Sequence, residues 1–289
     1  MTAACGHAAR ILALGLVLGS SLAHPQVSPV ARAAAAGPAV APAVRDRLRR
    51  HHRLYLPAGN ERVAGVVAVP GCSGVSLDPP ATDLGGGSPT DPLFRRHYPR
   101  MAERLRAHGH AVLLVDYLGG EGVVNACSGE VPPSVIADYI AEGVGWLRDH
   151  ARVDASRVHV LAWSLGGAGL LAHLRALPGT SAPYRSAIAV YPACEKARPW
   201  TVPVPVLFLL GGADDIAPAA SCEALVAGLP AGSVHVRRYE GARHGFDVEG
   251  ASERVSTGRG TTVGRDARAA AAAWDEITRF LGEGRPAAR

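Results

Sequence analysis

The segment RVHVLAWSLGG, residues 157–167, decides how this sequence folds. Its first seven residues have the apolar composition of a buried strand, and a helix is expected over residues 165–177. Ser164 alone stands between the two elements, so it lies at the apex of a sharp strand-to-helix turn. Such a turn needs small residues two positions before and after the serine, because larger side chains would clash. Ala162 and Gly166 occupy those positions.

This arrangement predicts a nucleophile elbow, in which the turn lifts the Ser164 hydroxyl above the sheet. The N-terminus of the following helix favours negative charge beside that hydroxyl. The usual pattern is Gly-x-Ser-x-Gly, and here Ala162 takes the place of the first glycine. The alternative interpretation is a serine that caps an ordinary helix.

Outward from this turn, apolar runs and helical patterns alternate along the chain. The alternation predicts an α/β fold, with parallel β-α-β units in one doubly wound, mostly parallel sheet that has helices on both faces. Two Gly- and Pro-rich stretches, 76–92 and 119–133, follow strand ends, where open α/β sheets bind their ligands. The expected strands are 63–69, 111–116, 157–163, 186–190, 204–210 and 233–239, and the expected helices are 93–108, 135–150, 165–177, 219–229 and 266–281.

Serine is a poor nucleophile without a base and a residue that orients the base. Asp214 and Asp215 follow the expected strand 204–210, and His244 follows the next strand. The order Ser, Asp, His, each after a separate strand, is that of α/β-hydrolases and differs from the orders of trypsin-like and subtilisin-like enzymes. Of the 12 histidines in the sequence, His244 has the required position. Asp214, four residues before Pro218, is favoured as the acid, and Asp215 is the alternative.

With these residues in place, the sequence resembles the dienelactone hydrolase family of α/β-hydrolases over residues 53–281. The matching segments are Pro70 to Val75, the turn at Ser164, Gly211-x-x-Asp214-x-x-x-Pro218, and Tyr239-x-Gly241-x-x-His244-Gly245-Phe246. The resemblance implies that Ser164 is the nucleophile, His244 the base and Asp214 the acid. The type enzymes carry a cysteine at the elbow and a glutamate in the early strand loop, where this chain has Ser164 and Gly71. These departures argue against dienelactone itself as the substrate and favour the chemistry of an ordinary serine esterase.

The oxyanion formed during ester cleavage needs two preorganised N–H donors. We expect one from the backbone of Leu165, next to the nucleophile, and the other from Cys72 in the early strand loop, with Ser73 as the alternative to Cys72. Asp116 also ends a strand near this edge of the sheet, and we expect it to have a structural role.

The predicted function is a secreted serine hydrolase that cleaves a carboxylic ester or lactone through this triad and an acyl-enzyme. One alternative is an exopeptidase or acyltransferase that uses the same triad. The other is a non-catalytic secreted binding protein on a hydrolase scaffold. No motif calls for a metal, nucleotide or flavin, so the expected partner is a small-molecule substrate, without cofactor, nucleic acid or stable membrane span.

The composition excludes a disordered chain, which would combine low hydrophobicity with high charge. Hydrophobic residues make up 48% of the 289 residues and charged residues 19%. The net charge of +5 is carried almost entirely by arginine, since Lys196 is the only lysine. A nucleic-acid binder gathers basic residues on one surface, whereas the only dense run here is 45–53. That run is predicted to be a solvated or pro-region segment, with an anionic partner as the alternative.

The N-terminus is predicted to direct export to the periplasm or the outside of the cell. Arg10 precedes an apolar stretch, residues 11–19, that is too short to cross a bilayer comfortably and is followed by small residues. Cleavage is expected after Ala23 or Ala36, and the alternative is an uncleaved membrane anchor. The predicted organisation is a signal peptide and candidate pro-region at 1–36, an Ala/Pro-rich and then Arg-rich linker at 37–52, and the hydrolase domain at 53–289.

Four cysteines remain after export, at Cys72, Cys127, Cys194 and Cys222. In an oxidising compartment they are expected to form two disulfides, and four reduced thiols are the alternative. There is no Cys-x-x-Cys or His-Glu-x-x-His pattern that would favour a metal site. In an α/β-hydrolase sheet, the strands before Cys194 and Cys222 should be neighbours, as should those before Cys72 and Cys127. This predicts the pairs Cys72–Cys127 and Cys194–Cys222.

Overall fold

A computed structural model of the chain describes residues 42–75, 92–178, 181–201, 204–229, 234–251, 255–256 and 260–283. The predicted signal peptide at 1–36 and residues 76–91 of the first Gly- and Pro-rich stretch lie outside the described residues. Within the described ranges, no helix has both the length and the apolar character needed to span a bilayer.

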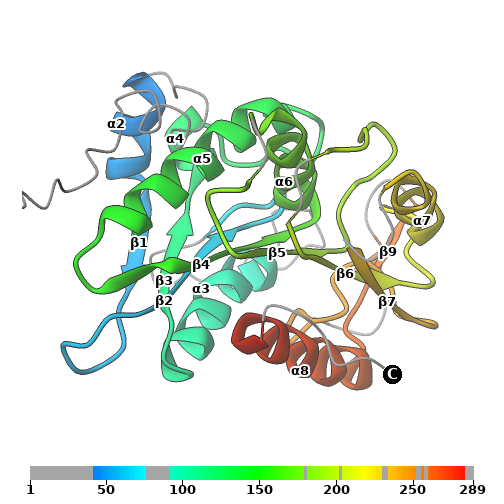
Figure 1. The fold of residues 1–289 in the computed structure, drawn as a ribbon. Helices are drawn as coiled ribbons and strands as arrows, with labels where there is room; N and C mark the ends of the chain where they lie inside the picture. The colour runs from blue at the N-terminus through cyan, green and yellow to red at the C-terminus, as the bar shows by residue number, and fades with distance from the viewer. Residues whose placement is uncertain are drawn as a thin grey trace, which may run out of the picture.

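The centre of the fold is a seven-stranded sheet with the strand order β1-β3-β2-β4-β5-β6-β7 (Figure 1). Neighbouring strands are parallel except β1, which runs antiparallel to β3 at one edge. The strands are β1 (His52–Tyr55), β2 (Val63–Val69), β3 (Ala111–Val115), β4 (Val153–Trp163), β5 (Ser186–Val190), β6 (Val206–Gly211) and β7 (Val234–Tyr239). This topology confirms the predicted doubly wound, mostly parallel sheet.

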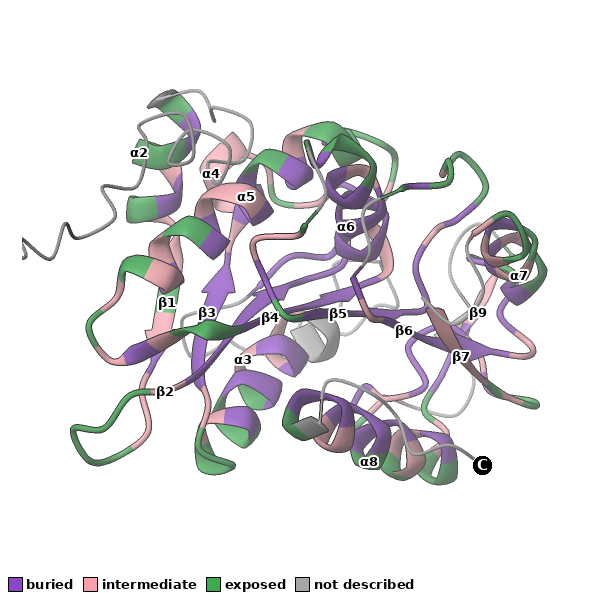
Figure 2. Cartoon of the chain, viewed as in Figure 1, coloured by how far each residue is buried: buried purple, intermediate pink, exposed green. Residues whose placement is uncertain are grey.

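Helices cover both faces of the sheet, which is why the central strands are nearly continuous apolar runs. Successive side chains of a strand point to opposite faces, so Val66 packs in one core and Val67 in the other. Figure 2 shows the buried strands between the two layers of helices. Helices α3 (Pro92–Ala107) and α8 (Ala267–Glu283) lie on the Val66 side, and helices α5 (Pro133–Asp149), α6 (Ser164–Ala176) and α7 (Ala219–Ala227) lie on the other.

The structure differs from the predicted linker and solvated basic run at the start of the domain. Helix α2 (Pro42–Arg50) leads directly into the edge strand β1. Val44 and Leu48 are 7% and 1% exposed and belong to the core on the α5 side of the sheet. Two apolar residues four positions apart share one helix face, so the arginines of α2 lie on its other sides. The folded domain therefore includes residues from Pro42 onward, ahead of the predicted start at residue 53.

The second Gly- and Pro-rich stretch begins inside a short helix, α4 (Tyr117–Glu121). Asp116 caps this helix, and its Oδ1 accepts a hydrogen bond of 2.9 Å from the backbone N–H of Gly119. Burial raises the pKa of Asp116, and the bond from Gly119 opposes that rise. Asp116 therefore stabilises a helix start beside the site, in line with the structural role expected for it.

Candidate active site

The turn at Ser164 joins β4 to α6 without an intervening loop. Ser164 has a φ of +49°, in the left-handed region that residues with a side chain rarely adopt. A residue held in this region costs about 1–3 kcal/mol and persists only where the surrounding structure fixes it. Such strain is concentrated at functional sites, so the conformation itself singles out Ser164.

The small residues after Ser164 are required by close packing on the end of β2. A Cβ on Gly166 would lie 2.4 Å from the carbonyl oxygen of Pro70 and 2.6 Å from that of Val69. A Cβ on Gly167 would lie 2.7 Å from the Cβ of Pro192. The first turn of α6 is therefore pressed against the end of β2 and the loop after β5, the two strands that flank β4.

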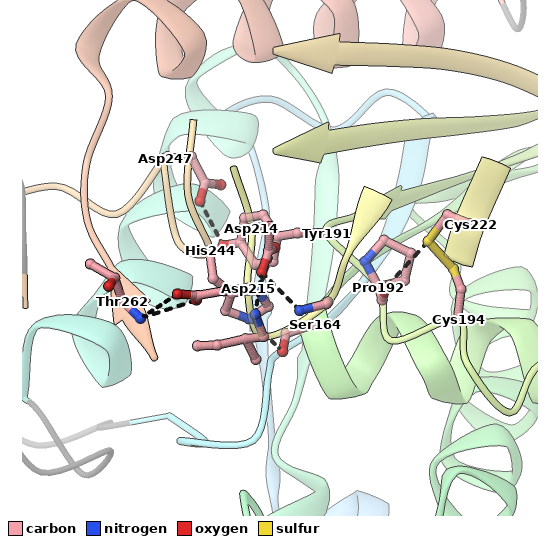
Figure 3. A network of polar contacts seen from close by, with 12 residues as sticks. Ser164, Tyr191, Pro192, Cys194, Asp214, Asp215, Cys222, His244, Asp247 and Thr262 are labelled. Carbon is pink, nitrogen blue, oxygen red and sulfur yellow. Dashed lines mark hydrogen bonds and ion pairs between the residues drawn. A yellow bond between two sulfur atoms is a disulfide. The ribbon is translucent and has the colours of Figure 1, made fainter. Parts of the chain in front are cut away.

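Ser164, His244 and Asp214 form one hydrogen-bonded chain (Figure 3). The Nε2 of His244 lies 2.9 Å from the Oγ of Ser164, and its Nδ1 lies 2.7 Å from the Oδ2 of Asp214. His244 and Asp214 are each 6% exposed. The three residues follow β4, β6 and β7, so the carboxyl edge of the sheet brings them together from distant parts of the sequence.

The two adjacent aspartates after β6 have different partners. The second carboxylate oxygen of Asp214, Oδ1, accepts hydrogen bonds from the backbone N–H groups of Ile216 (2.9 Å) and Ala217 (2.8 Å). The carboxylate of Asp215 accepts from the backbone N–H of Thr262 instead, at 3.0 and 3.2 Å. The structure therefore places Asp214 at the imidazole and Asp215 against the strand β9 (Thr262–Val263).

The loop after β2 lies against Ser164. A Cβ on Gly71 would be 3.2 Å from the Cβ of Ser164 and 2.7 Å from the hydroxyl of Tyr98. The backbone turns here, because the N–H of Gly74 donates to the carbonyl of Gly71 at 3.1 Å. Cys72 lies inside this turn, and its carbonyl accepts a hydrogen bond of 2.9 Å from Ala126.

Comparison with known proteins decides the family. Residues 95–284, more than half of the chain, match the model of the dienelactone hydrolase family. The chain belongs to the dienelactone hydrolase family. It is therefore a hydrolase, and the resemblance stated from the sequence motifs is confirmed.

Solved structures support the same α/β-hydrolase fold. A dienelactone hydrolase-like promiscuous phosphotriesterase from metagenomic libraries aligns with a TM-score of 0.57 and 18% identity, over 78% of this chain and 88% of that one. Esterase 2 of Thermogutta terrifontis, phosphoramylated by tabun, aligns with a TM-score of 0.51 and 17% identity, over 82% of this chain and 91% of that one. At these identities the likeness concerns the fold. No curated protein matched the chain.

Two disulfides border the site of this dienelactone hydrolase family member. Cys72 is bonded to Cys127, and Cys194 to Cys222, with Cα–Cα distances of 4.8 and 5.1 Å. These are the pairs expected from the order of the strands. The first ties the loop beside Ser164 to the segment after α4, and the second ties the loop after β5 to α7.

Sequence reasoning missed a buried polar cluster next to Ser164 and His244 of this hydrolase. Asp247 accepts hydrogen bonds from the Nε1 of Trp163 (2.9 Å) and the hydroxyl of Tyr191 (2.6 Å), and the Nε2 of His97 lies 3.3 Å from it. Asp247 is only three residues after His244, which was the one local signal. Its partners are 56 to 150 positions away in the sequence, so no short motif links them.

The described residues also line a cavity of about 400 Å³ between α3 and α8. Its lining includes His97 and Asp247 but none of the three residues of the hydrogen-bonded chain. In the described part of the hydrolase, no group of three or more His, Cys, Asp or Glu side chains is arranged to hold a metal ion.

Proposed function

We propose that this chain is an exported serine hydrolase that cleaves a carboxylic ester or lactone through Ser164, His244 and Asp214. The observation that carries the proposal is the hydrogen-bonded chain of these residues, with distances of 2.9 and 2.7 Å, at a strained strand-to-helix turn. A nucleophile, its base and the residue that orients the base need this order of contacts.

The first half of the reaction forms an acyl-enzyme. Asp214 accepts a hydrogen bond from Nδ1–H of His244, so the other ring nitrogen, Nε2, is free to take the proton of Ser164. The Oγ of Ser164 then attacks the ester carbonyl, and the carbonyl oxygen becomes an oxyanion. When the C–O bond breaks, His244 returns that proton to the leaving alcohol, and Asp214 stabilises the imidazolium that exists in between.

The second half releases the acid. Water attacks the acyl carbonyl while His244 takes one of its protons, and His244 then returns a proton to the Oγ of Ser164. In both halves the oxyanion would accept hydrogen bonds from the backbone N–H groups of Leu165 and Cys72, with Ser73 as the alternative second donor. The closeness of the Gly71 backbone to Ser164 supports this part of the proposal.

The residues around the nucleophile support a small-molecule ester as the substrate rather than dienelactone. Position 71, where the type enzymes of the family carry a glutamate, is a glycine in this chain. Even a Cβ there would approach the hydroxyl of Tyr98 to 2.7 Å, so a longer side chain would need its neighbours to move. The chain therefore has no acidic side chain at this position to recognise a polar substrate group.

The proposal of export rests on the N-terminal pattern and on the two disulfides. Disulfides form and persist in oxidising compartments, and the described part of the chain has two of them. Cleavage after Ala23 or after Ala36 would leave the buried residues of α2 in the mature protein, because that helix begins at Pro42. The mass of the N-terminal peptide of protein recovered from the exported fraction decides between the two cleavage sites, and an intact N-terminus contradicts the proposal.

The test of the proposed chemistry compares the protein with its Ser164→Ala variant. A fluorophosphonate probe should label the protein at Ser164 and leave the variant unlabelled. On p-nitrophenyl esters of graded acyl length, the variant should lose several orders of magnitude in kcat while its unfolding transition is kept, since triad members act as a unit. Near-normal ester hydrolysis by a folded variant would refute the triad. Faster cleavage of peptide p-nitroanilides than of the esters would indicate an exopeptidase instead.

A further inference from the structure

Asp247 is a buried carboxylate that the proposed triad does not use. Its side chain is 8% exposed, and it lies in the turn directly after His244. Its Oδ1 accepts from the hydroxyl of Tyr191 at 2.6 Å, and its Oδ2 accepts from the Nε1 of Trp163 at 2.9 Å. The Nε2 of His97, whose side chain is 1% exposed, lies 3.3 Å from the same Oδ2. One carboxylate thus joins α3, the end of β4 and the residue after β5.

The surroundings of Asp247 keep it ionised. Burial alone raises the pKa of this carboxyl, but the nearby His97 and the hydrogen bonds from Tyr191 and Trp163 together outweigh that effect and lower it. A buried ion pair is weak evidence for stability, because apolar residues of similar volume often stabilise a fold as well or better. The hydrogen bonds to Asp247 do orient two side chains, Trp163 directly before the nucleophile and Tyr191 beside the base.

Tyr191 links the carboxylate to the base. Its ring centroid lies 4.6 Å from that of His244, and Figure 3 shows both side chains beside Asp214. Tyr191 has a φ of +36° and is, with Ser164, one of the two described residues other than glycine that have a positive φ. A backbone in this region keeps its conformation only where contacts hold it. The bond to Asp247 holds the far end of this side chain.

Trp163 links the carboxylate to the nucleophile. It is the residue directly before Ser164 and ends β4 with its side chain fully buried. Its indole packs edge-on against the rings of Tyr98 and His97, with centroid distances of 5.5 and 5.8 Å. The bond from Nε1 to Asp247 fixes the rotation of this indole, and with it the packing beneath the strained turn.

Asp247 is not the acid of the triad, because Asp214 already occupies the Nδ1 side of His244 at 2.7 Å. Any effect of Asp247 on the reaction must therefore pass through Tyr191 and Trp163. We propose that Asp247, together with the adjacent His97, is a positioning residue that holds the Ser164 turn and the His244 imidazole in the orientation that the reaction needs. This inference rests on the proposed function, since it assumes that Ser164 and His244 carry the reaction.

The test replaces the carboxylate by its amide in Asp247→Asn. Tyr191 and Trp163 donate to different carboxylate oxygens, and the amide replaces one of these oxygens by a donor nitrogen, so one of the two bonds is lost. We expect kcat on p-nitrophenyl esters to fall about 10- to 100-fold, the cost of a small misplacement of reacting groups. KM should change by less than about threefold, because substrate contacts are kept. The rate constant of fluorophosphonate labelling should fall by a similar factor as kcat.

Glu276→Gln is the matched control. Glu276 is also a buried carboxylate, with a side chain 6% exposed, and it pairs with Arg237 of β7 at 3.1 Å and with Arg279 of α8 at 3.2 Å. The same chemical change there should leave kcat within about twofold, although stability falls as in any broken buried pair. An equal loss of kcat in both variants would overturn the proposal, because the effect would then be one of general destabilisation.

A second variant, Tyr191→Phe, removes only the hydroxyl and keeps the protein testable if Asp247→Asn fails to fold. Like Asp247→Asn, it should lower kcat and leave KM nearly unchanged. Wild-type kcat in either folded variant overturns the positioning role. Ser164→Ala separates the two proposals: if it is inactive while Asp247→Asn is fully active, only the positioning role fails. If Ser164→Ala is active, the proposed triad itself fails.

Discussion

Asp214 and Asp215 are adjacent carboxylates whose different partners separate their roles. Asp214 bonds to the imidazole of His244, whereas Asp215 bonds to the backbone of Thr262. We expect Asp214→Asn to lower kcat on the order of 10³-fold or more, because an amide in this place disfavours the reactive tautomer of the imidazole. Asp215→Asn should stay within about threefold, since Asp215 does not contact the imidazole and an asparagine keeps an oxygen that can accept the bond from Thr262. Steady-state kinetics of both variants measure the ranking, and the reverse ranking would move the acid's role to Asp215.

At the level of single residues, the sequence was sufficient to predict the positions of residues that come directly after a strand. Ser164, Asp214 and His244 each follow their own strand, so the topology alone brings them to one edge of the sheet. The buried partners of Asp247 could not be predicted from the order of the strands. Their contacts depend on which way side chains turn in the core, and His97 lies on a helix that begins far from the triad in sequence.

The first turn of α6 is the element on which the site depends most. In Gly166→Ala the new Cβ would meet two backbone carbonyls, at 2.4 and 2.6 Å, which cannot rotate away. We expect the free energy of unfolding to fall by about 1–3 kcal/mol, as for overpacked cores. We also expect kcat to fall, because α6 and the loop after β2 would be pushed apart. Urea unfolding and ester kinetics of the same preparation measure both effects.

Gly145→Ala is the control for that substitution. Gly145 lies on the exposed side of α5, and a Cβ there would have no atom within 4 Å. Alanine in an open helical position should raise the free energy of unfolding by about 0.5–1 kcal/mol, since it has the better helix propensity. The activity should not change. If the two variants had the same free energy of unfolding and the same kcat, the close contact of Gly166 with β2 would not be important for stability or activity.

The second disulfide should stabilise the element that carries the acid. It joins Cys194, after β5, to Cys222 in α7, and α7 follows directly on the turn that bonds Asp214. Replacing both cysteines by serine should lower the free energy of unfolding by about 2–4 kcal/mol, through the greater freedom of the unfolded chain. Denaturant unfolding without reductant compares the variant with the wild type. An unchanged midpoint and slope would contradict this contribution.

At the level of elements, long apolar runs were easy to assign and short mixed ones were not. Four strands, β2, β3, β5 and β6, are buried on both faces. Their sequences are apolar apart from Ser186 at the start of β5, and their positions were predicted within a few residues. Helix α2 has five polar or charged residues among nine and buries only one face, so its arginines suggested a solvated segment. The spacing of Val44 and Leu48 was the available signal for a packed helix.

In the whole molecule, the residues of the proposed reaction lie at one edge of the sheet, and the apolar side chains that stabilise the fold form two separate cores. Each core borders a buried histidine that takes no part in the proposed reaction. His159 shares its face of β4 with Leu161 and Trp163, on the side of α3 and α8, whereas His173 lies on the side of α5 and α6. His159 lies on β4, where its Nδ1 is 2.7 Å from the hydroxyl of Ser186, and His173 lies on α6. Both side chains are almost fully buried, at 1% and 2% exposure. Desolvation lowers the pKa of His159 to about 3 and that of His173 to about 4.

These two histidines should make the stability of the whole molecule depend on pH. In the unfolded chain a histidine titrates near pH 6.5, so below that pH the unfolded state binds protons that the folded state does not. Stability therefore falls as the pH drops from 6.5 toward 4, by about 2 kcal/mol for each residue between pH 7 and pH 5. Urea unfolding of the wild type and of His159→Gln and His173→Gln at both pH values measures this. In each variant the free energy of unfolding should fall by about 2 kcal/mol less between pH 7 and pH 5 than in the wild type, because the group that titrates is gone. Variants that keep the wild-type pH dependence would show that these histidines bind protons equally well in the folded and unfolded states.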